Sequence, residues 1–275
     1  MPQTSVKLEA MIKSKPTLEF LLKRWQASGI EPGDTVLLHS DVVRTLLVLR
    51  RRHLESHPVI VLESFLELLR EGTLLLPTFN FQFTTGATFD IRNSVSEMGL
   101  LTEVARQDSR AVRSGHPIYS FSAFGKNKGL FQGLENHSGY GPDSPFAILR
   151  ELDGKIAVLD IPDERCMTFI HHVEEMHTAP YRYHKEFTGP YIDASGRSMI
   201  RSFSLFVRNL ERGVKTDVKP LGDRLSLEGA YTGDPPLIDS GLRTIRAKAL
   251  YNYTSKIINN EEAEGMLYKS SESTR

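Results

Sequence analysis

The residues best suited to chemistry lie in one short segment, Thr168-Phe169-Ile170-His171-His172-Val173-Glu174. In a helix, side chains three and four positions apart are neighbours, so Thr168, His171 and Glu174 share one face while an apolar stripe occupies the other. Histidine titrates near neutral pH, and an adjacent carboxylate fixes its tautomer and stabilises its protonated form. The spacing therefore predicts a general base, His171, oriented by Glu174.

The same segment permits other interpretations. A solvated helix face with incidental charge would have the same spacing, and Glu175, four residues after His171, could orient the ring instead. His172 and His177 lie nearer the apolar side, which favours packing or surface positions. The cluster of histidines and glutamates also suggests a metal site, but neither H-E-x-x-H nor H-x-x-E-H occurs and no third ligand is close in sequence. We therefore expect no metal.

Four further features carry weaker indications of chemistry. Cys166 could be a nucleophile, although a small buried residue near a helix start fits better. His39 and Ser40 end a buried strand, where α/β sheets bind ligands, but a polar pair can also simply terminate a strand. His116 follows a flexible Ser-Gly pair and could line a cleft or be exposed. The basic run at residues 50–53 is typical of a solvated surface, or of a contact to phosphate.

Composition narrows the class of protein. The 275 residues carry 34 basic and 34 acidic side chains, a balance that does not favour nucleic acid or an anionic membrane as partner. The single cysteine, the absence of an apolar leader and the lack of any apolar run near ~20 residues indicate a cytoplasmic protein without membrane spans. We expect an enzyme or a small-molecule binder, and homo-oligomerisation is compatible with the sequence.

Strand-like and helix-like segments alternate along the chain, which predicts a layered α/β/α fold around a central mixed sheet. We expect helices over residues 17–27, 59–70, 100–106, 145–152 and 242–258. We expect strands over residues 35–39, 73–76, 119–124 and 155–160, and a hairpin turning at Ser195-Gly196-Arg197.

The chain lacks a convincing internal linker. We therefore predict one domain over residues 1–258, with the C-terminal third packed on the same core, followed by a polar tail at residues 259–275. The loop at residues 80–96 is long and rich in Phe, Thr and Gly, and long loops in compact domains are often functional.

Six short motifs, taken in order, resemble the aminoglycoside 3-N-acetyltransferase family, antibiotic N-acetyltransferases that use acetyl-coenzyme A and differ from the GNAT fold. The resemblance covers roughly residues 39–190. The motifs are His39-Ser40, Gly72 to Phe79, Phe89-Asp90, Arg113 to Pro117, Gly141 to Pro145, and Thr168 with His171 and Glu174. Each motif is short, and the common order of all six carries the resemblance.

The resemblance implies a direct transfer with a small-molecule amine as acceptor and acetyl-coenzyme A as donor. His171 would take a proton from the amine, Glu174 would orient the imidazole, and Thr168 is a candidate contributor to the same site. The amine would attack the thioester carbonyl without a covalent enzyme intermediate. The resemblance also makes four residues candidates for the coenzyme channel, namely His39, Ser40, Arg113 and Ser114.

Two departures from the family pattern leave other acceptors open. After His39-Ser40 the family has a second serine and a glycine-rich stretch, whereas this chain continues Asp41-Val42-Val43-Arg44 and then the basic run. A polycationic acceptor also favours an acidic surface, and this chain is neutral. The alternative acceptor is a less cationic amino sugar, such as a nucleotide-linked sugar of a surface polysaccharide. A metal-dependent hydrolase and a non-catalytic coenzyme A binder are the competing classes.

Overall fold

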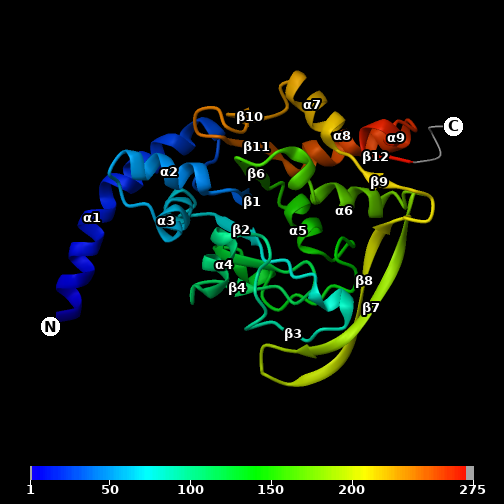
Figure 1. Ribbon diagram of the computed structural model, residues 1–275, viewed down its shortest axis with the longest axis horizontal. Helices are drawn as coiled ribbons and strands as arrows, with labels where there is room; N and C mark the ends of the chain where they lie inside the picture. The colour runs from blue at the N-terminus through cyan, green and yellow to red at the C-terminus, as the bar shows by residue number, and fades with distance from the viewer. Residues whose placement is uncertain (1, 271–275) are drawn as a thin grey trace.

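The computed structural model describes residues 2–270, with side chains from residue 14 onward. A seven-stranded mixed sheet lies at its centre (Figure 1). In spatial order the strands are β10 (Thr232–Gly233), β11 (Leu242–Arg246), β6 (Lys155–Leu159), β1 (Thr35–Ser40), β2 (Thr73–Pro77), β5 (Phe121–Gly125) and β4 (Val112–Arg113). The middle strands are continuous apolar runs buried on both faces, as expected for parallel strands covered by helices.

Strand β1 organises the sheet. It runs parallel to both β2 and β6, with Leu37 opposite Leu75 and Ile156, while the outer strands β5 and β11 are antiparallel to their neighbours. The predicted mixed sheet is therefore confirmed. The carboxyl ends of β1, β2 and β6 share one edge, and β2 and β6 lie on opposite sides of β1. Such a switch point is where open α/β sheets bind ligands.

Helices cover both faces of the sheet, which confirms the layered α/β/α prediction. One face packs against α1 (Pro2–Trp25), α3 (Pro58–Leu68) and α4 (Leu100–Gln107), and α2 (Val43–Arg51) joins β1 to this layer. The other face packs against α5 (Pro145–Glu151), α6 (Phe169–Met176) and α8 (Ala247–Asn259). Side chains of β1 alternate between the two cores, with Leu37 in one and Val36 and Leu38 in the other. Four short 3₁₀ turns complete this part, η1 (Gln26–Ser28), η2 (Gln82–Thr85), η3 (Lys128–Leu130) and η4 (Asp163–Arg165).

The C-terminal third packs on the same core but differs from the sequence prediction at two places. Residues 242–246 form β11 rather than the start of a helix, because they complete a hydrogen-bonded ladder along β6 and are buried there. The segment expected as a polar tail is folded up to residue 270. It contains α9 (Ala263–Met266) and β12 (Tyr268–Lys269), which pairs with β9 (Lys215–Thr216), and Leu267 between them is fully buried. Residues 271–275 lie outside the described part of the chain. Helix α7 (Lys219–Leu227) packs beside α9.

A long hairpin extends from the core as a curved arm at the lower right of Figure 1. It consists of β7 (Arg182–Ile192) and β8 (Ser198–Arg208), joined through Gly196 at φ 91°, so the predicted hairpin is confirmed and is longer than expected. Strand β3 (Phe89–Asp90), from the loop at residues 80–96, adds to its edge. Phe83 of that loop is buried against Phe203 of β8.

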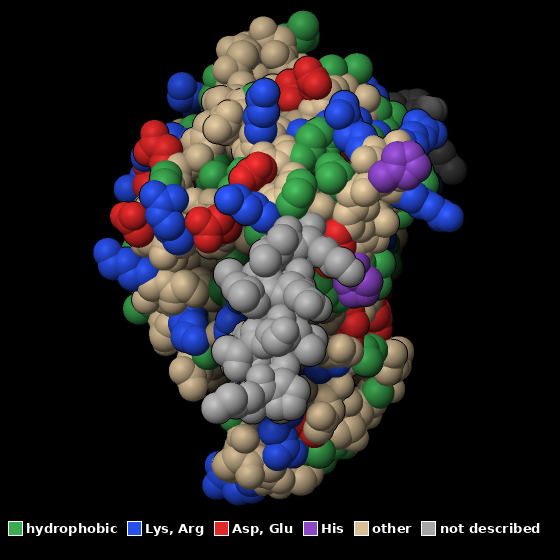
Figure 2. All heavy atoms as spheres, turned by 90° about the vertical axis from the view of Figure 1, so that its left-hand side faces the viewer, with side chains coloured by type: hydrophobic (Ala, Val, Ile, Leu, Met, Phe, Trp, Pro, Cys, Tyr) green, Lys and Arg blue, Asp and Glu red, His purple; other side chains and the backbone are tan. Residues whose placement is uncertain are grey.

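The outer surface carries both signs of charge. On the part of the α1 side that is not drawn in grey, basic and acidic side chains are interspersed rather than gathered by sign (Figure 2). This distribution agrees with the formal net charge of +0. Within residues 2–270, no helix combines the length and apolar character needed to cross a membrane.

Candidate active site

Helix α6 carries the predicted base and is buried on almost every side. Phe169, Ile170 and Val173 are wholly shielded and belong to the core between the helix and the sheet. The sequence analysis placed Glu174 on a polar face, but its side chain is only 1% exposed. Residues at the start of β7 cover this polar face of α6. The polar face is therefore part of a partly enclosed site rather than a solvated surface.

The predicted pair of His171 and Glu174 is present. His171 Nδ1 lies 2.8 Å from Glu174 Oε2, and Tyr181 donates its hydroxyl to Glu174 Oε1 at 3.0 Å. Arg182 adds an ion pair, with its Nε 2.7 Å from Glu174 Oε2. Glu174 is thus held by three neighbours, and its orientation relative to the imidazole is fixed by contacts on both oxygens.

The turn after α6 brings these neighbours back. Thr178 adopts a left-handed conformation at φ 46°, and the amides of Thr178 and Ala179 donate to the carbonyls of Glu175 and Glu174 at 3.0 Å each. This is the Schellman pattern, which satisfies terminal carbonyls and reverses the chain. Tyr181 and Arg182 therefore return over the helix they have just left.

Two groups compete for His171 Nδ1. Besides Glu174, the Arg182 guanidinium lies 2.9 Å from this nitrogen through its Nη2. A ring nitrogen cannot donate to one group and accept from the other at once. We assign the proton to Nδ1, because a buried carboxylate is the stronger partner and Arg182 also donates to the Phe206 carbonyl at 3.0 Å. The other ring nitrogen, Nε2, then has a free lone pair.

The surroundings keep His171 neutral. Burial lowers the pKa of His171 below 6.5, and the Arg182 charge lowers it further, against the opposing effect of Glu174. Burial alone would raise the pKa of Glu174, but Arg182, His171 and Tyr181 together outweigh it and the pKa of this carboxyl is lowered. A neutral imidazole beside an ionised carboxylate is the state that a general base requires.

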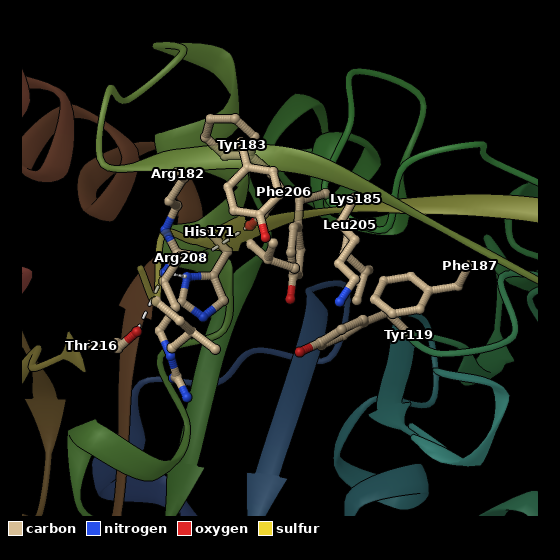
Figure 3. Close-up of a pocket in the computed structure, with 13 residues that line it drawn as sticks. Tyr119, His171, Arg182, Tyr183, Lys185, Phe187, Leu205, Phe206, Arg208 and Thr216 are labelled. Carbon is tan, nitrogen blue, oxygen red and sulfur yellow. Dashed lines mark hydrogen bonds between the residues drawn. The ribbon is translucent and has the colours of Figure 1, made fainter. Parts of the chain in front are cut away.

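His171 faces a cavity of about 280 Å³ beneath the hairpin (Figure 3). Its side chain is 18% exposed, so the ring is accessible from this cavity. The aromatic part of the wall comes from Tyr119, Tyr140 and Phe187, and the polar part includes cationic side chains of β7 and β8. The rings of Tyr140 and His171 meet edge to face with centroids 5.3 Å apart.

Buried histidines position the two tyrosines. His116 Nδ1 accepts the backbone N–H of Tyr119 at 3.1 Å, and His172 Nδ1 donates to the Tyr140 carbonyl at 2.7 Å. Both positions expected for His116, in a cleft or at the surface, are wrong because this residue is fully buried. The sequence analysis also missed the tyrosines and Arg182. The only local signal was the placement of Tyr140 between two glycines.

The alternatives left open around α6 are resolved by the contacts. Glu175 does not orient His171, because it accepts the Ser138 hydroxyl at 2.7 Å. His172 is a packing residue, as predicted, and His177 bonds to the Ser255 hydroxyl at 2.9 Å. Burial raises the pKa of the Cys166 thiol, which argues against a nucleophilic thiolate. Over residues 14–270, no group of three or more His, Cys, Asp or Glu side chains is placed to hold a metal ion.

Thr168 lies one turn before His171, and its carbonyl accepts the His171 backbone N–H at 3.0 Å. Its side chain is half-buried and is not among the described residues that line the cavity beside His171. Thr168 therefore supports the start of α6 through its backbone in this structure.

His39 and Ser40 lie at the carboxyl edge of β1, as predicted. Within the described part of the chain, the buried His39 Nε2 and Ser40 Oγ have no hydrogen-bond partner. Ser40 lines a second cavity of about 420 Å³, together with Arg165 and the start of α4. An unpartnered buried polar atom beside a cavity, here Ser40 Oγ, fits a ligand with polar groups, whereas His39 does not line this cavity. Arg44 at this edge is not a free cation, since it forms an ion pair with Asp160 at 2.8 Å.

Arg113 and Ser114 are located away from both cavities. The Arg113 guanidinium donates to the Ser94 carbonyl at 2.6 Å, the Thr78 carbonyl at 3.0 Å and the Ser120 hydroxyl at 3.0 Å. Ser114 Oγ is wholly buried and accepts the Phe121 backbone N–H at 2.8 Å. The donors of Arg113 are thus consumed in fastening the loop at residues 80–96, which argues for structural roles rather than coenzyme contacts.

Replacing Arg113 with methionine is therefore expected to lower the free energy of unfolding by about 3 kcal/mol, because several buried acceptors lose their donor. Urea unfolding measures this change. Arg110→Met is the matched control, since the Arg110 side chain is 50% exposed and its ion pairs lie at the surface, where about 1 kcal/mol or less is expected. An Arg113→Met protein of unchanged stability with a raised KM for acetyl-coenzyme A would instead support a coenzyme contact.

Comparisons with known proteins agree with this architecture. The profile of the aminoglycoside 3-N-acetyltransferase family matches residues 47–259. Aminoglycoside N(3)-acetyltransferase VII of Streptomyces paromomycinus is 28% identical over 198 residues, covering 64% of this chain and 66% of the relative. Aminoglycoside N(3)-acetyltransferase III of Pseudomonas aeruginosa is 27% identical, covering 56% and 62%. The chain thus spans about two thirds or less of the length of these curated relatives.

Solved structures show the same fold. AAC-IIIb in a binary complex with CoASH superposes with a TM-score of 0.75 at 20% identity, covering 89% of this chain and 96% of that chain. Aminoglycoside acetyltransferase AAC(3)-Xa gives a TM-score of 0.74 at 24% identity, covering 88% and 92%. AAC-VIa bound to sisomicin superposes with a TM-score of 0.73 at 19% identity, covering 89% of this chain and 97% of that chain. Because the family profile matches well over half of its residues, the chain belongs to the aminoglycoside 3-N-acetyltransferase family.

Proposed function

We propose that the protein transfers an acetyl group from acetyl-coenzyme A to an amine of an aminoglycoside or related amino sugar, with His171 as general base. The observation that carries the proposal is the state of His171. Its Nδ1 is held by a buried Glu174 while the ring faces a cavity. Family membership supports the reaction class, and two relatives of the same fold were solved with CoASH and with sisomicin.

In this reaction His171 Nε2 takes a proton from the acceptor amine as the nitrogen bonds to the thioester carbonyl carbon. Collapse of the tetrahedral intermediate breaks the carbon–sulfur bond, and the thiolate leaves and is then protonated. Glu174 stabilises the imidazolium that forms, and Arg182 keeps that carboxyl ionised. The developing oxyanion needs hydrogen-bond donors, and the Tyr119 and Tyr140 side chains line the same cavity.

The donor substrate belongs at the sheet edge in this proposal. The unpartnered atoms of His39 and Ser40 lie there, and burial lowers the pKa of His39 to about 4, so this imidazole is a neutral donor and acceptor. We assign His39 and Ser40, rather than Arg113 and Ser114, to acetyl-coenzyme A. We also propose that residues 1–258 act as one acetyltransferase domain, and a free Cys166 is compatible with the reducing cytoplasm.

Thiol release from acetyl-coenzyme A tests this function. The acceptor panel would contain sisomicin and simple amino sugars, and mass spectrometry would identify the acetylated product. The expected result is amine-dependent thiol release together with a product about 42 Da heavier than the acceptor, because an acetyl group replaces one hydrogen. Binding of coenzyme A without transfer to any amine would contradict catalysis and favour a non-catalytic binder.

A further inference from the structure

The cavity beside His171 is cationic. Three basic side chains, Arg182, Lys185 and Arg208, belong to its wall, and none of the described residues that line it is an aspartate or glutamate. In Figure 3 the side chains of Lys185, Arg208 and His171 extend into the space below the hairpin. An amine with further positive charges would meet repulsion here, whereas an anion would be attracted.

The three cations differ in what they already bind. Arg182 is committed to the protein, because it pairs with Glu174 and donates to the Phe206 carbonyl. Within residues 14–270, Lys185 and Arg208 form no ion pair, and the nearest described aromatic contact of Lys185 is the Phe187 ring, 5.4 Å from its Nζ. Both side chains are exposed to solvent. These two cations are therefore available to a ligand that enters the cavity.

We propose that Lys185 and Arg208 form an anion subsite, and that the acceptor is an amino sugar carrying a phosphoryl group. This inference rests on the proposed N-acetyltransferase function and specifies its acceptor. A phosphoryl group bound by these cations would place the rest of the molecule in the cavity that His171 also lines, so its amine can reach this ring. Hydrogen bonds between charged groups are stronger than neutral ones, so the subsite selects acceptors by charge as well as shape.

A phosphate of acetyl-coenzyme A is the competing occupant of these cations. The two assignments predict different kinetics. An acceptor subsite affects the KM of the acceptor and the ranking of acceptors, whereas a coenzyme subsite affects the KM of acetyl-coenzyme A with every acceptor. The ranking of acceptors that differ only in their phosphoryl group therefore separates them.

The experiment uses glucosamine, glucosamine 1-phosphate and UDP-glucosamine, which share one amine, with sisomicin as the polycationic comparison. We expect kcat/KM for the phosphorylated acceptors to exceed that for glucosamine by at least about tenfold, and sisomicin to be poorer still. A preference between glucosamine 1-phosphate and UDP-glucosamine distinguishes a sugar phosphate from a nucleotide-linked sugar. Equal rates with glucosamine and glucosamine 1-phosphate would overturn the proposal.

Charge reversal locates the subsite. The double variant Lys185→Glu/Arg208→Glu is expected to lose the preference for phosphorylated acceptors while the KM of acetyl-coenzyme A stays within about twofold. Arg50→Glu/Arg51→Glu is the matched control, since it makes the same charge change at exposed residues of α2 that line neither cavity. Loss of the preference in this control, or a raised KM of acetyl-coenzyme A in the first variant with unchanged ranking, would contradict the assignment.

A binding measurement makes the test independent of turnover. Calorimetric titration of glucosamine 1-phosphate against glucosamine, without coenzyme A, should show tighter binding of the phosphate that weakens with salt and disappears in the Lys185/Arg208 variant. Such binding without any acetyl transfer would refute the proposed function but retain the anion subsite. Absence of this binding would refute the subsite, even in an active enzyme.

Discussion

Replacing His171 with alanine is expected to lower kcat for N-acetylation by about 10²–10⁴-fold, the usual contribution of a general base. His171 is the imidazole that faces the cavity, and Glu174 occupies its Nδ1 at 2.8 Å, so Nε2 is the ring nitrogen left for proton transfer. The measurement is thiol release with the best acceptor, at pH values around neutrality.

His177→Ala is the matched control. His177 lies just beyond the same helix, is bonded to Ser255 and does not line the cavity. It should keep activity within about twofold, since surface substitutions away from the chemistry rarely cost more than about 0.5 kcal/mol. Equal activity losses in the two variants would point to damage of α6, and a fully active His171→Ala enzyme would refute the proposed base.

Glu174→Gln tests the coupling within the pair. Among the charges near His171, Glu174 is the one that raises the pKa of the imidazole, while Arg182 lowers it. Removing the carboxylate charge should therefore lower the pKa of His171 further and reduce kcat. NMR titration of the His171 ring measures this pKa directly, and a value that does not move would exclude Glu174 as the orienting charge.

A second large effect is expected in acid, where the free energy of unfolding should fall. Three buried histidines resist protonation in the folded protein. Burial lowers the pKa of His39 to about 4, of His116 to about 3 and of His172 to about 4, from 6.5 in each case. Each ring is neutral in the fold, and two of them hold backbone groups next to the cavity tyrosines.

The direction of this change in stability follows from the protons that the folded and unfolded chains bind. Below pH 6.5 the unfolded chain takes up protons at these rings and the folded chain does not, so the contribution is full above pH 6.5 and is lost as pH falls toward the folded pKa values. Each ring contributes about 1.4 kcal/mol per pH unit in that range, so the free energy of unfolding should fall by about 5 kcal/mol between pH 7 and pH 5. Urea unfolding at the two pH values measures the change.

His116→Asn provides the control for this slope. Asparagine can keep an acceptor near the Ile118 and Tyr119 amides that His116 Nδ1 now serves, but it does not titrate. The variant should lose the part of the slope that His116 contributes, whatever its stability at pH 7. An identical replacement at His137, whose side chain is 61% exposed, is the matched control for the substitution itself. A stability that is level from pH 7 to pH 5 would contradict the burial argument.

Most of the central sheet could be predicted from the sequence, because β1, β2 and β6 are apolar runs bounded by turns. The predicted helix at residues 242–258 is wrong only over residues 242–246, since α8 covers the rest. Leu242 and Ile245 fit a helical spacing together with Ala249 and Tyr253, but β6 had a free edge that only the folded core presents. The folding of residues 259–270 could not be predicted for the same reason, since the burial of Leu267 depends on distant partners.

The site was predictable where it is local. His171 and Glu174 are one helical turn apart, so their contact follows from spacing alone. Arg113 shows the opposite case, because a sequence motif does not reveal that carbonyls from residues 78–94 consume its donors. The sequence also could not predict that Lys185 and Arg208 line the same cavity, since this depends on how the hairpin curves over α6.

By itself, the sequence determined the α/β layering, the spacing that places carboxylates one helical turn from His171, and the resemblance to a family of acetyltransferases. Only the tertiary structure decided that Glu174 rather than Glu175 contacts this imidazole, that burial and the Arg182 charge keep it neutral, and that the cavity it faces is cationic. The physical reason is the separation in sequence of the groups that interact. Helical spacing and strand patterns act between near neighbours in sequence, whereas burial and charge act between groups that the fold brings together.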